Sequence, residues 1–224
     1  MKLNYKTFWR KSGLKGRWGE IYLSRLEKYK PKIFLEIGVF CGVTARNTCD
    51  YLFQVHKNNF NYTGIDLFGG QKQSSGSEIE PKFLKNQKFS NPLKNIYYNY
   101  ILKENLNSLE SNKKFLQKYE KNVQLIAGDT NEVLKNIDLS SIDFVFLDGG
   151  HSYKTVLNDL EIIYKNLKNR NKVILCDDYG KESLINEVKN AIDDFTKTNN
   201  IKLSEYFLGT FLNYKFCKSI LNYR

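Results

Sequence analysis

Short apolar runs alternate with amphipathic stretches along most of the chain. Residues 142–147, IDFVFL, are almost entirely apolar, as a central parallel strand that is buried on both faces requires. Similar short runs, each bounded by polar or turn-forming residues, recur at regular intervals. We expect strands at residues 33–35, 60–65, 123–129, 142–147 and 172–176.

Between these runs, apolar residues recur at the three- and four-residue spacing of amphipathic helices. This spacing predicts helices at residues 20–30, 43–57, 132–137, 153–167 and 182–198. Residues 204–218 are rich in aromatic side chains and predict two further strands around Gly209. The alternation favours an α/β fold, a Rossmann-like, doubly wound, mostly parallel seven-stranded sheet with an antiparallel C-terminal hairpin strand.

The length of 224 residues suits a single domain over residues 1–224, with an N-terminal cover at 1–31 and C-terminal strands at 199–224. The interval 67–122 is long and polar. A compact domain rarely keeps a connection of this length without using it. We interpret the interval as a lid over a substrate, and a plain surface insertion is the alternative.

Hydrophobic residues make up 41% of the chain, and no stretch approaches the roughly 20 apolar residues of a membrane span. The N-terminus carries charge without a following apolar core, so we expect no secretory signal and a cytoplasmic protein. The four cysteines show no CxxC spacing, which suggests neither zinc nor disulfides.

The formal net charge is +11, but the lysines are scattered and form no run of five or more basic residues. This distribution does not indicate a nucleic-acid partner. It fits solvated faces in a chain rich in lysine and asparagine. The alternative is a positive field that favours phosphorylated or nucleotide-linked substrates.

The sequence KIFLEIGVFCGVTAR at residues 32–46 predicts a strand, a tight turn and a helix start. Gly38 permits a turn with positive φ, and Gly42 permits a ligand or the sheet to approach the first helical turn. Thr44 adds a hydroxyl at the helix start. The free N–H groups there suit an anionic group such as a carboxylate. Ordinary turn glycines are the alternative.

Every predicted parallel strand ends in an acidic residue, and ligands of parallel sheets bind beyond these ends. The acids are Glu36, Asp66, Asp129, Asp148 and the pair Asp177 and Asp178. A carboxylate at the end of the second strand, Asp66, is the usual partner of ribose hydroxyls. A turn-capping role is the alternative for Asp66.

Asp148, Asp177 and Asp178 end neighbouring strands in the predicted order, so their like charges require a positive partner. Oxygen-only ligands select a hard cation such as Mg²⁺, Ca²⁺ or Mn²⁺. In the alternative, Asp177 caps the following helix and Asp178 is solvated. His151 follows Asp148 by three residues and is either a general base or a structural residue of the loop.

Five motifs together resemble the class I S-adenosylmethionine-dependent methyltransferases. They are LEIGVFCGVT, GID, GD, FLDGGHSYKTVLNDL and ILCDDY, and they cover about residues 32–180. Within that class the chain is similar to the metal-dependent O-methyltransferases, which include catechol O-methyltransferase and the macrolide-sugar O-methyltransferases.

The resemblance implies a role for each residue of these motifs. Glu36, Gly38, Gly42 and Thr44 would surround the methionine part of S-adenosylmethionine, Asp66 the ribose, and Gly128 and Asp129 the adenine side. Asp148 is also expected among the cofactor-binding residues. Asp148, Asp177 and Asp178 match the ligands of a divalent metal, for which Mg²⁺ is expected. In the catechol branch a lysine three residues after the first metal aspartate takes the hydroxyl proton, and here that position holds His151, so His151 and Asp148 are the expected catalytic residues.

The expected acceptor is a hydroxyl of a sugar or nucleotide-linked sugar, and the alternative is a phenolic or polyketide molecule. A nucleic-acid methyltransferase is disfavoured because the fourth strand ends in FLDGG and not in an NPPY-like sequence. The loop reads ExGxxxG and not GxGxxG, which disfavours a nicotinamide dehydrogenase. Acids at every strand end speak against a binding module without chemistry. The tryptophans near the N-terminus and the aromatic C-terminal strands are compatible with a homodimer.

Overall fold

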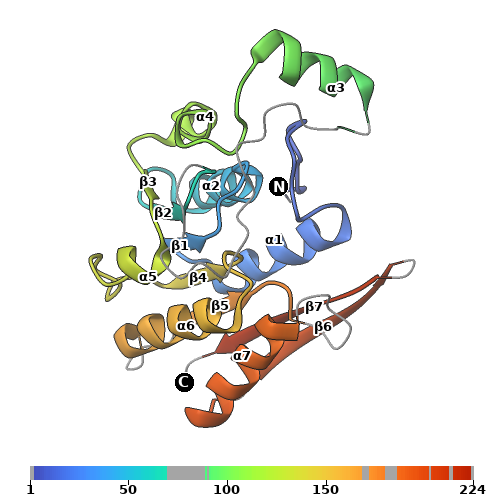
Figure 1. Cartoon of the computed structure of the whole chain (residues 1–224). Helices are drawn as coiled ribbons and strands as arrows, with labels where there is room; N and C mark the ends of the chain where they lie inside the picture. Colours follow the sequence, from blue (N-terminus) through green and yellow to red (C-terminus); the bar gives the residue numbers. More distant parts are fainter. Residues whose placement is uncertain are drawn as a thin grey trace.

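A seven-stranded sheet with the strand order β3-β2-β1-β4-β5-β7-β6 forms the centre of the protein (Figure 1). The computed structural model describes residues 3–69, 89, 91–167, 172–179, 186–201, 203–211 and 214–222. The strands are β1 (Ile33–Ile37), β2 (Asn61–Asp66), β3 (Val123–Ala127), β4 (Phe144–Leu147), β5 (Val173–Cys176), β6 (Leu203–Phe211) and β7 (Tyr214–Asn222). The helices are α1 (Arg17–Tyr29), α2 (Val43–His56), α3 (Pro92–Ile96), the π-helix η1 (Tyr97–Leu102), α4 (Leu109–Phe115), the 3₁₀-helix η2 (Gln117–Tyr119), α5 (Thr130–Val133), α6 (Tyr153–Leu167) and α7 (Asn186–Thr198).

Strands β1 to β5 are all parallel, which confirms the predicted α/β fold with a parallel sheet. β1 pairs with β2 on one side and with β4 on the other. The strand order therefore reverses direction between β1 and β4. In open α/β sheets this switch point opens a crevice at the carboxyl ends of the strands, where ligands bind.

The last two strands extend the sheet beyond β5. β7 runs antiparallel to β5, with Val173 opposite Asn222 and Cys176 opposite Ser219. β6 pairs with β7 in the antiparallel direction, with an irregularity between Leu203 and Glu205.

Helices cover both faces of the parallel sheet, because successive strand residues point to opposite faces. On the face of α1 and α2, Phe34 stacks between Tyr62 and Phe144, with ring centroids 5.9 and 5.2 Å apart. On the other face, Leu35 of β1, Val145 of β4 and Ile174 of β5 pack against α6 and α7. Figure 1 shows these two helix layers on either side of the strands.

Some elements differ from the expectation in their bounds. The short helix expected at 132–137 is found at Thr130–Val133, and α7 is described from Asn186 onward, so the beginning of the expected helix lies outside the described residues. Part of the interval 67–122, residues 70–88 and 90, also lies outside the described residues. The remainder of that interval holds α3, η1, α4 and η2. No helix in the described part of the chain has both the length and the apolar character needed to cross a membrane.

Candidate functional site

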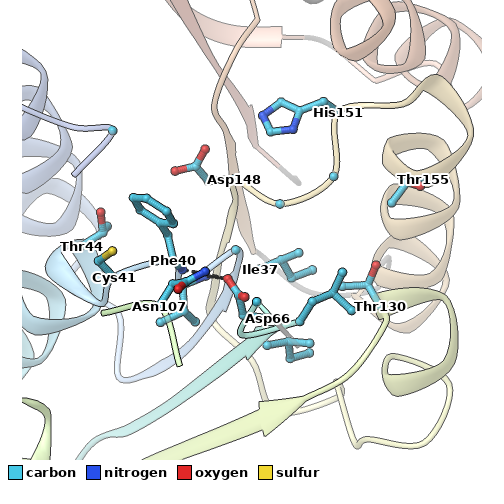
Figure 2. A pocket seen from close by; sticks show the side chains of 18 of the residues that line it. Ile37, Phe40, Cys41, Thr44, Asp66, Asn107, Thr130, Asp148, His151 and Thr155 are labelled. Carbon is cyan, nitrogen blue, oxygen red and sulfur yellow. Dashed lines mark hydrogen bonds between the residues drawn. The ribbon is translucent and has the colours of Figure 1, made fainter. Parts of the chain in front are cut away.

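A cavity of about 750 Å³ lies at the switch point, beyond the carboxyl ends of β1, β2, β3 and β4 (Figure 2). Of the residues singled out in the sequence, it is lined by Gly38, Thr44, Asp66, Gly128, Asp129, Asp148 and His151. Glu36 and Gly42 are not among the described residues that line it, and Asp177 and Asp178 line a smaller adjoining cavity. The sheet therefore brings together most of the residues that were expected to meet there.

Gly38 is required where the loop after β1 meets the loop after β4. Its φ is +90°, and a Cβ atom at this position would lie 2.0 Å from the carbonyl oxygen of Asp148. Its N–H donates a 2.9 Å hydrogen bond to the carbonyl of Ile65. A side chain would therefore separate the two loops that form the wall of the cavity.

Gly42 serves a neighbouring helix and not the cavity. It precedes α2 with φ +72°, and a Cβ atom would lie 2.2 Å from the Oδ1 atom of Asn112 in α4. The Nδ2 group of Asn112 donates a 3.0 Å hydrogen bond to the carbonyl of Phe40. The close approach to Gly42, which the sequence analysis expects from a ligand or the sheet, is in this structure made by a side chain of α4.

Asp66 holds the glycine loop by hydrogen bonds. Its Oδ2 atom accepts from the N–H groups of Val39 and Phe40 at 2.7 and 2.8 Å, and its Oδ1 atom accepts from Phe68 at 2.6 Å. Burial raises the pKa of the Asp66 carboxyl group, and these three N–H donors act in the opposite direction. A carboxylate has about four acceptor positions, so three are in use and about one remains for a ligand.

The N-terminal segment, which the sequence predicts only as part of a cover at 1–31, forms one wall of the cavity. Lys11, Ser12 and Gly13 line the cavity. The hydroxyl of Tyr5 lies 3.3 Å from that of Ser12 and 3.0 Å from that of Thr44, which links the segment to the start of α2. No periodicity marks these residues, because their position depends on hydrogen bonds to distant parts of the chain.

Asp129 caps α5 at the opposite end of the cavity. Its Oδ1 atom accepts from the backbone N–H of Asn131 at 2.9 Å and from the side-chain amide of Asn131 at 2.7 Å. The N–H of Gly128 donates to the carbonyl of Asp66 at 3.0 Å, which holds the ends of β2 and β3 together. Thr130 also lines the cavity here and was not anticipated.

Glu36 lies beneath the site on the α1 and α2 face of the sheet. Its side chain is fully buried, and its Oε2 atom accepts a 2.7 Å hydrogen bond from the hydroxyl of Tyr62. Its Oε1 atom has no hydrogen-bond partner among the described residues. Burial in this apolar layer raises the pKa of Glu36 from 4.5 to about 8.

Glu36→Gln should therefore change how stability depends on pH. The unfolded chain releases the Glu36 proton near pH 4.5, whereas the folded protein keeps it up to about pH 8. This raised pKa makes the wild type lose stability as the pH rises through that window, by up to about 1.4 kcal/mol per pH unit. Glutamine does not ionise, so the Glu36→Gln variant does not lose stability in this way as the pH rises.

Thermal unfolding of both proteins at several pH values between about 5 and 8 checks this expectation. The melting temperature of Glu36→Gln, relative to wild type, should increase steadily with pH. Glu132→Gln, at a side chain that is 66% exposed, is the matched control and should show no such trend. A constant difference between Glu36→Gln and wild type would mean that Glu36 is ionised throughout.

Asp148, His151, Asp177 and Asp178 line the adjoining cavity, which has a volume of about 10 Å³. The Nε2 atom of His151 lies 3.2 Å from the Oδ2 atom of Asp178. Asp178 has a φ of +57°, an uncommon conformation for a residue with a side chain. The ends of β4 and β5 thus place an imidazole against a carboxylate at the edge of the large cavity.

The three carboxylates do not form a compact ligand group as they stand. Within the described part of the chain, no group of three or more histidine, cysteine, aspartate or glutamate side chains is arranged to hold a metal ion. Their chemistry does suit a hard cation, since all three offer carboxylate oxygens beside one small cavity.

The cavity also suits an elongated ligand with several polar groups. In Figure 2 the side chains of Asp66 and Asn107 lie at its base, the ring of Phe40 lies between them and Asp148, Thr130 lies to one side, and His151 lies above. Carboxylates at one end can accept hydroxyl groups. The imidazole of His151 offers a ring nitrogen that can act as a proton acceptor.

The sequence matches one family of known proteins, and the fold matches many solved structures. A family model described as a methyltransferase domain matches residues 35–179. A search of curated proteins found no match to the chain. The match to the family model spans all of the cavity residues from Ile37 to Thr155.

Three of the similar structures are methyltransferases with a ligand bound. Methyltransferase PaMTH1 from Podospora anserina, bound to SAH, is 15% identical with a TM-score of 0.57, and the comparison covers 94% of this chain and 80% of that chain. The O-methyltransferase from Bacillus cereus in complex with SAH is 12% identical, with coverage of 89% and 77% and a TM-score of 0.52. The O-methyltransferase TomG from Streptomyces achromogenes, involved in tomaymycin synthesis and in complex with SAM, is 13% identical, with coverage of 90% and 77% and a TM-score of 0.54. At these identities the likeness shows a shared fold.

Proposed function

Because the chain belongs to the methyltransferase-domain family, whose fold is that of the class I S-adenosylmethionine-dependent methyltransferases, we propose that it methylates a hydroxyl of a sugar or nucleotide-linked sugar. The observation that carries the proposal is the cavity at the switch point, which the glycine loop, Asp66, Asp129 and His151 line together. S-adenosylmethionine would supply an electrophilic methyl group at this site.

The residues proposed to bind the cofactor form two groups of different chemistry, one at each end of the cavity. At one end, Lys11, Ser12 and Thr44 provide a cation and two hydroxyls near the start of α2, which suits the charged methionine part. At the other end, the remaining acceptor position of Asp66 suits a ribose hydroxyl, and Gly128 and Asp129 border the space for the base.

His151 is the proposed general base. Its side chain is 52% exposed, so an acceptor hydroxyl can approach the ring. During methyl transfer, His151 would take up the proton that the acceptor hydroxyl gives up as its oxygen is methylated. Asp178 can orient the ring and stabilise the imidazolium that forms, as carboxylates do beside catalytic histidines.

A divalent cation, with Mg²⁺ preferred, is also part of the proposal. Asp148, Asp177 and Asp178 would hold it, which is supported by their all-oxygen donor chemistry and by the small cavity that they border. Such an ion would supply positive charge that favours the ionised form of the acceptor hydroxyl.

Residues from the interval 67–122 support its proposed role as a lid. Asn107 lines the cavity, and Asn112 is fully buried between α4 and the glycine loop. A lid formed by this interval would exclude water during transfer and contact the acceptor. We therefore expect this interval to influence which acceptor is used.

A phenolic or polyketide acceptor is the second candidate. The ring of Phe40 stands in the cavity with the backbone of Phe40 at a φ of +51° (Figure 2). An aromatic ring at this place can stack on a planar acceptor. The positive net charge of +11 instead favours an acceptor that carries phosphate, and this supports the nucleotide-linked sugar as the first candidate.

A methyl-transfer assay with two acceptor panels tests the proposal. Purified protein is incubated with S-adenosylmethionine and Mg²⁺, with nucleotide sugars in one panel and phenols in the other, and products are detected by mass spectrometry. We expect an O-methylated nucleotide sugar and a loss of at least about tenfold in rate with a chelator. Transfer only to phenols would replace the first candidate by the second, and a rate that is equal in chelator would remove the metal from the proposal.

A further inference from the structure

Exposed large hydrophobic side chains gather in one place on the described part of the surface. Five of the seven lie on α3 and η1, where the side chains of Leu93, Tyr100 and Ile101 are 64%, 69% and 65% exposed. A sixth, Trp9, packs edge-on against Tyr97 with ring centroids 6.4 Å apart. We call the set Trp9, Leu93, Ile96, Tyr97, Tyr100 and Ile101 the outer stripe. A contiguous apolar patch of this kind marks an interaction site.

The outer stripe is one face of a helical segment whose other face is anchored to the protein. Its five helical members are spaced at three, one, three and one residues, which is the pattern of a single helix face. On the inner side, Tyr98 is only 6% exposed and packs with Cys41 and Leu106. Tyr98 thus makes the contacts that hold the helical segment against the protein, and the outer stripe faces outward.

The surroundings of the outer stripe are positively charged. The sequence from residue 89 to residue 103 contains two lysines and no acidic residue. The Nζ atom of Lys94 lies 5.8 Å from the ring centroid of Trp9, and Lys103 at the end of η1 is exposed. The Nζ atom of Lys11 lies 5.5 Å from the ring centroid of Phe89 nearby. Any partner of the stripe must therefore accept both apolar side chains and cations.

We propose that the outer stripe docks on an anionic lipid surface. A second copy of this chain would bring equal clusters of lysines together, which opposes association in a protein whose net charge is +11. A bilayer with acidic headgroups offers negative charge to the lysines and an apolar layer to the stripe. Tryptophan and tyrosine side chains favour the boundary between the two, and amphipathic helices with basic flanks bind there.

Docking of the outer stripe would place the cavity close to the lipid surface. α3 lies at the far side of the molecule from α7 (Figure 1), and Tyr98 connects the helical segment to Cys41. Cys41 is part of the glycine loop and lines the large cavity. The membrane-facing side and the cavity wall are therefore two faces of one packed unit.

Flotation with lipid vesicles tests this proposal directly. The full chain is mixed with vesicles of phosphatidylcholine, or of equimolar phosphatidylcholine and phosphatidylglycerol, and the bound fraction is measured over a range of salt. We expect wild type to bind the anionic vesicles and to bind less as salt is added. Ile101→Asp should lower the partition coefficient at least about tenfold, because it removes apolar burial and adds a repelled charge.

Val55→Asp is the matched control, since Val55 is the seventh exposed hydrophobic side chain and lies on α2 outside the stripe. It should bind within about twofold of wild type. Tyr100→Asp provides a second stripe variant, and circular dichroism confirms that each variant is folded. Failure of wild type to bind anionic vesicles would overturn the proposal, as would binding that Ile101→Asp and Tyr100→Asp leave unchanged. A dimer that Ile101→Asp dissociates, without vesicle binding, would assign the stripe to a second copy.

Discussion

Replacing His151 by alanine should lower kcat for methyl transfer by about a hundredfold to ten-thousandfold, which is the typical contribution of a positioned general base. The side chain lies at the edge of the large cavity, and its Nε2 atom is 3.2 Å from the Oδ2 atom of Asp178. The affinity for S-adenosylhomocysteine should stay within about twofold of wild type, because the proposed cofactor contacts come from other residues. Steady-state kinetics and calorimetry measure these two quantities separately.

His56→Ala is the control for this prediction, since the chain has only two histidines. The Nε2 atom of His56 lies 2.9 Å from the carbonyl of Pro31, at the end of α2 and outside the cavity lining. Its removal should leave kcat unchanged. Equal activity of His151→Ala and wild type on the identified acceptor would refute the role of His151 as base.

Gly38→Ala should cost several kcal/mol of stability and abolish cofactor binding. The new methyl group would meet the carbonyl oxygen of Asp148 at 2.0 Å, and the φ of +90° is itself unfavourable for alanine. Together these effects should lower the free energy of unfolding by about 3 kcal/mol or more. The loops after β1 and β4, which together form a wall of the cavity, would also separate.

Thermal unfolding and binding of S-adenosylhomocysteine measure the two effects of Gly38→Ala. Gly13→Ala is the matched control for stability, because a Cβ atom at Gly13 has no neighbour within 4 Å. Its melting temperature should stay close to that of wild type. If Gly38→Ala retained both the melting temperature and the affinity of wild type, the contact between the two loops would not be what holds the cavity together.

The fold could be predicted where local pattern and topology act together. The strand expected at residues 142–147 is found as β4, whose four residues are apolar and buried on both faces of the sheet. The gathering of Asp66, Asp129 and Asp148 at one cavity followed from the rule that parallel strands end at the same edge. These parts of the site could be predicted without knowing which residues far apart in the chain contact one another.

The remaining parts of the site depend on contacts between residues far apart in the chain. Glu36 was expected beside the ligand, but the alternation of β1 turns it toward Tyr62 in the core. Gly42 leaves room for the side chain of Asn112, and no local sequence pattern predicts that contact. Lys11 reaches the cavity because Arg10 is buried, with its Nε group donating a 2.8 Å hydrogen bond to the carbonyl of Cys41.

Periodicity also could not tell which face of the segment at residues 92–102 is buried. The sequence has apolar residues on most sides of this segment, including Tyr98 on the inner face and Ile101 on the outer face. The packing of Tyr98 against Cys41 shows which face of the segment is buried. The outer stripe is identified by the large exposed fractions of its side chains in the structure.

The central claim is that the cavity at the switch point binds S-adenosylmethionine, and isothermal titration of the full chain with S-adenosylhomocysteine tests it without knowledge of the acceptor. The account predicts binding of one molecule per chain with a dissociation constant of about 1 to 100 µM, both with Mg²⁺ and with a chelator. Asp129→Ala should weaken the binding, because Asp129 borders the proposed space for the base. An absence of binding by folded wild-type protein under both conditions would contradict the account.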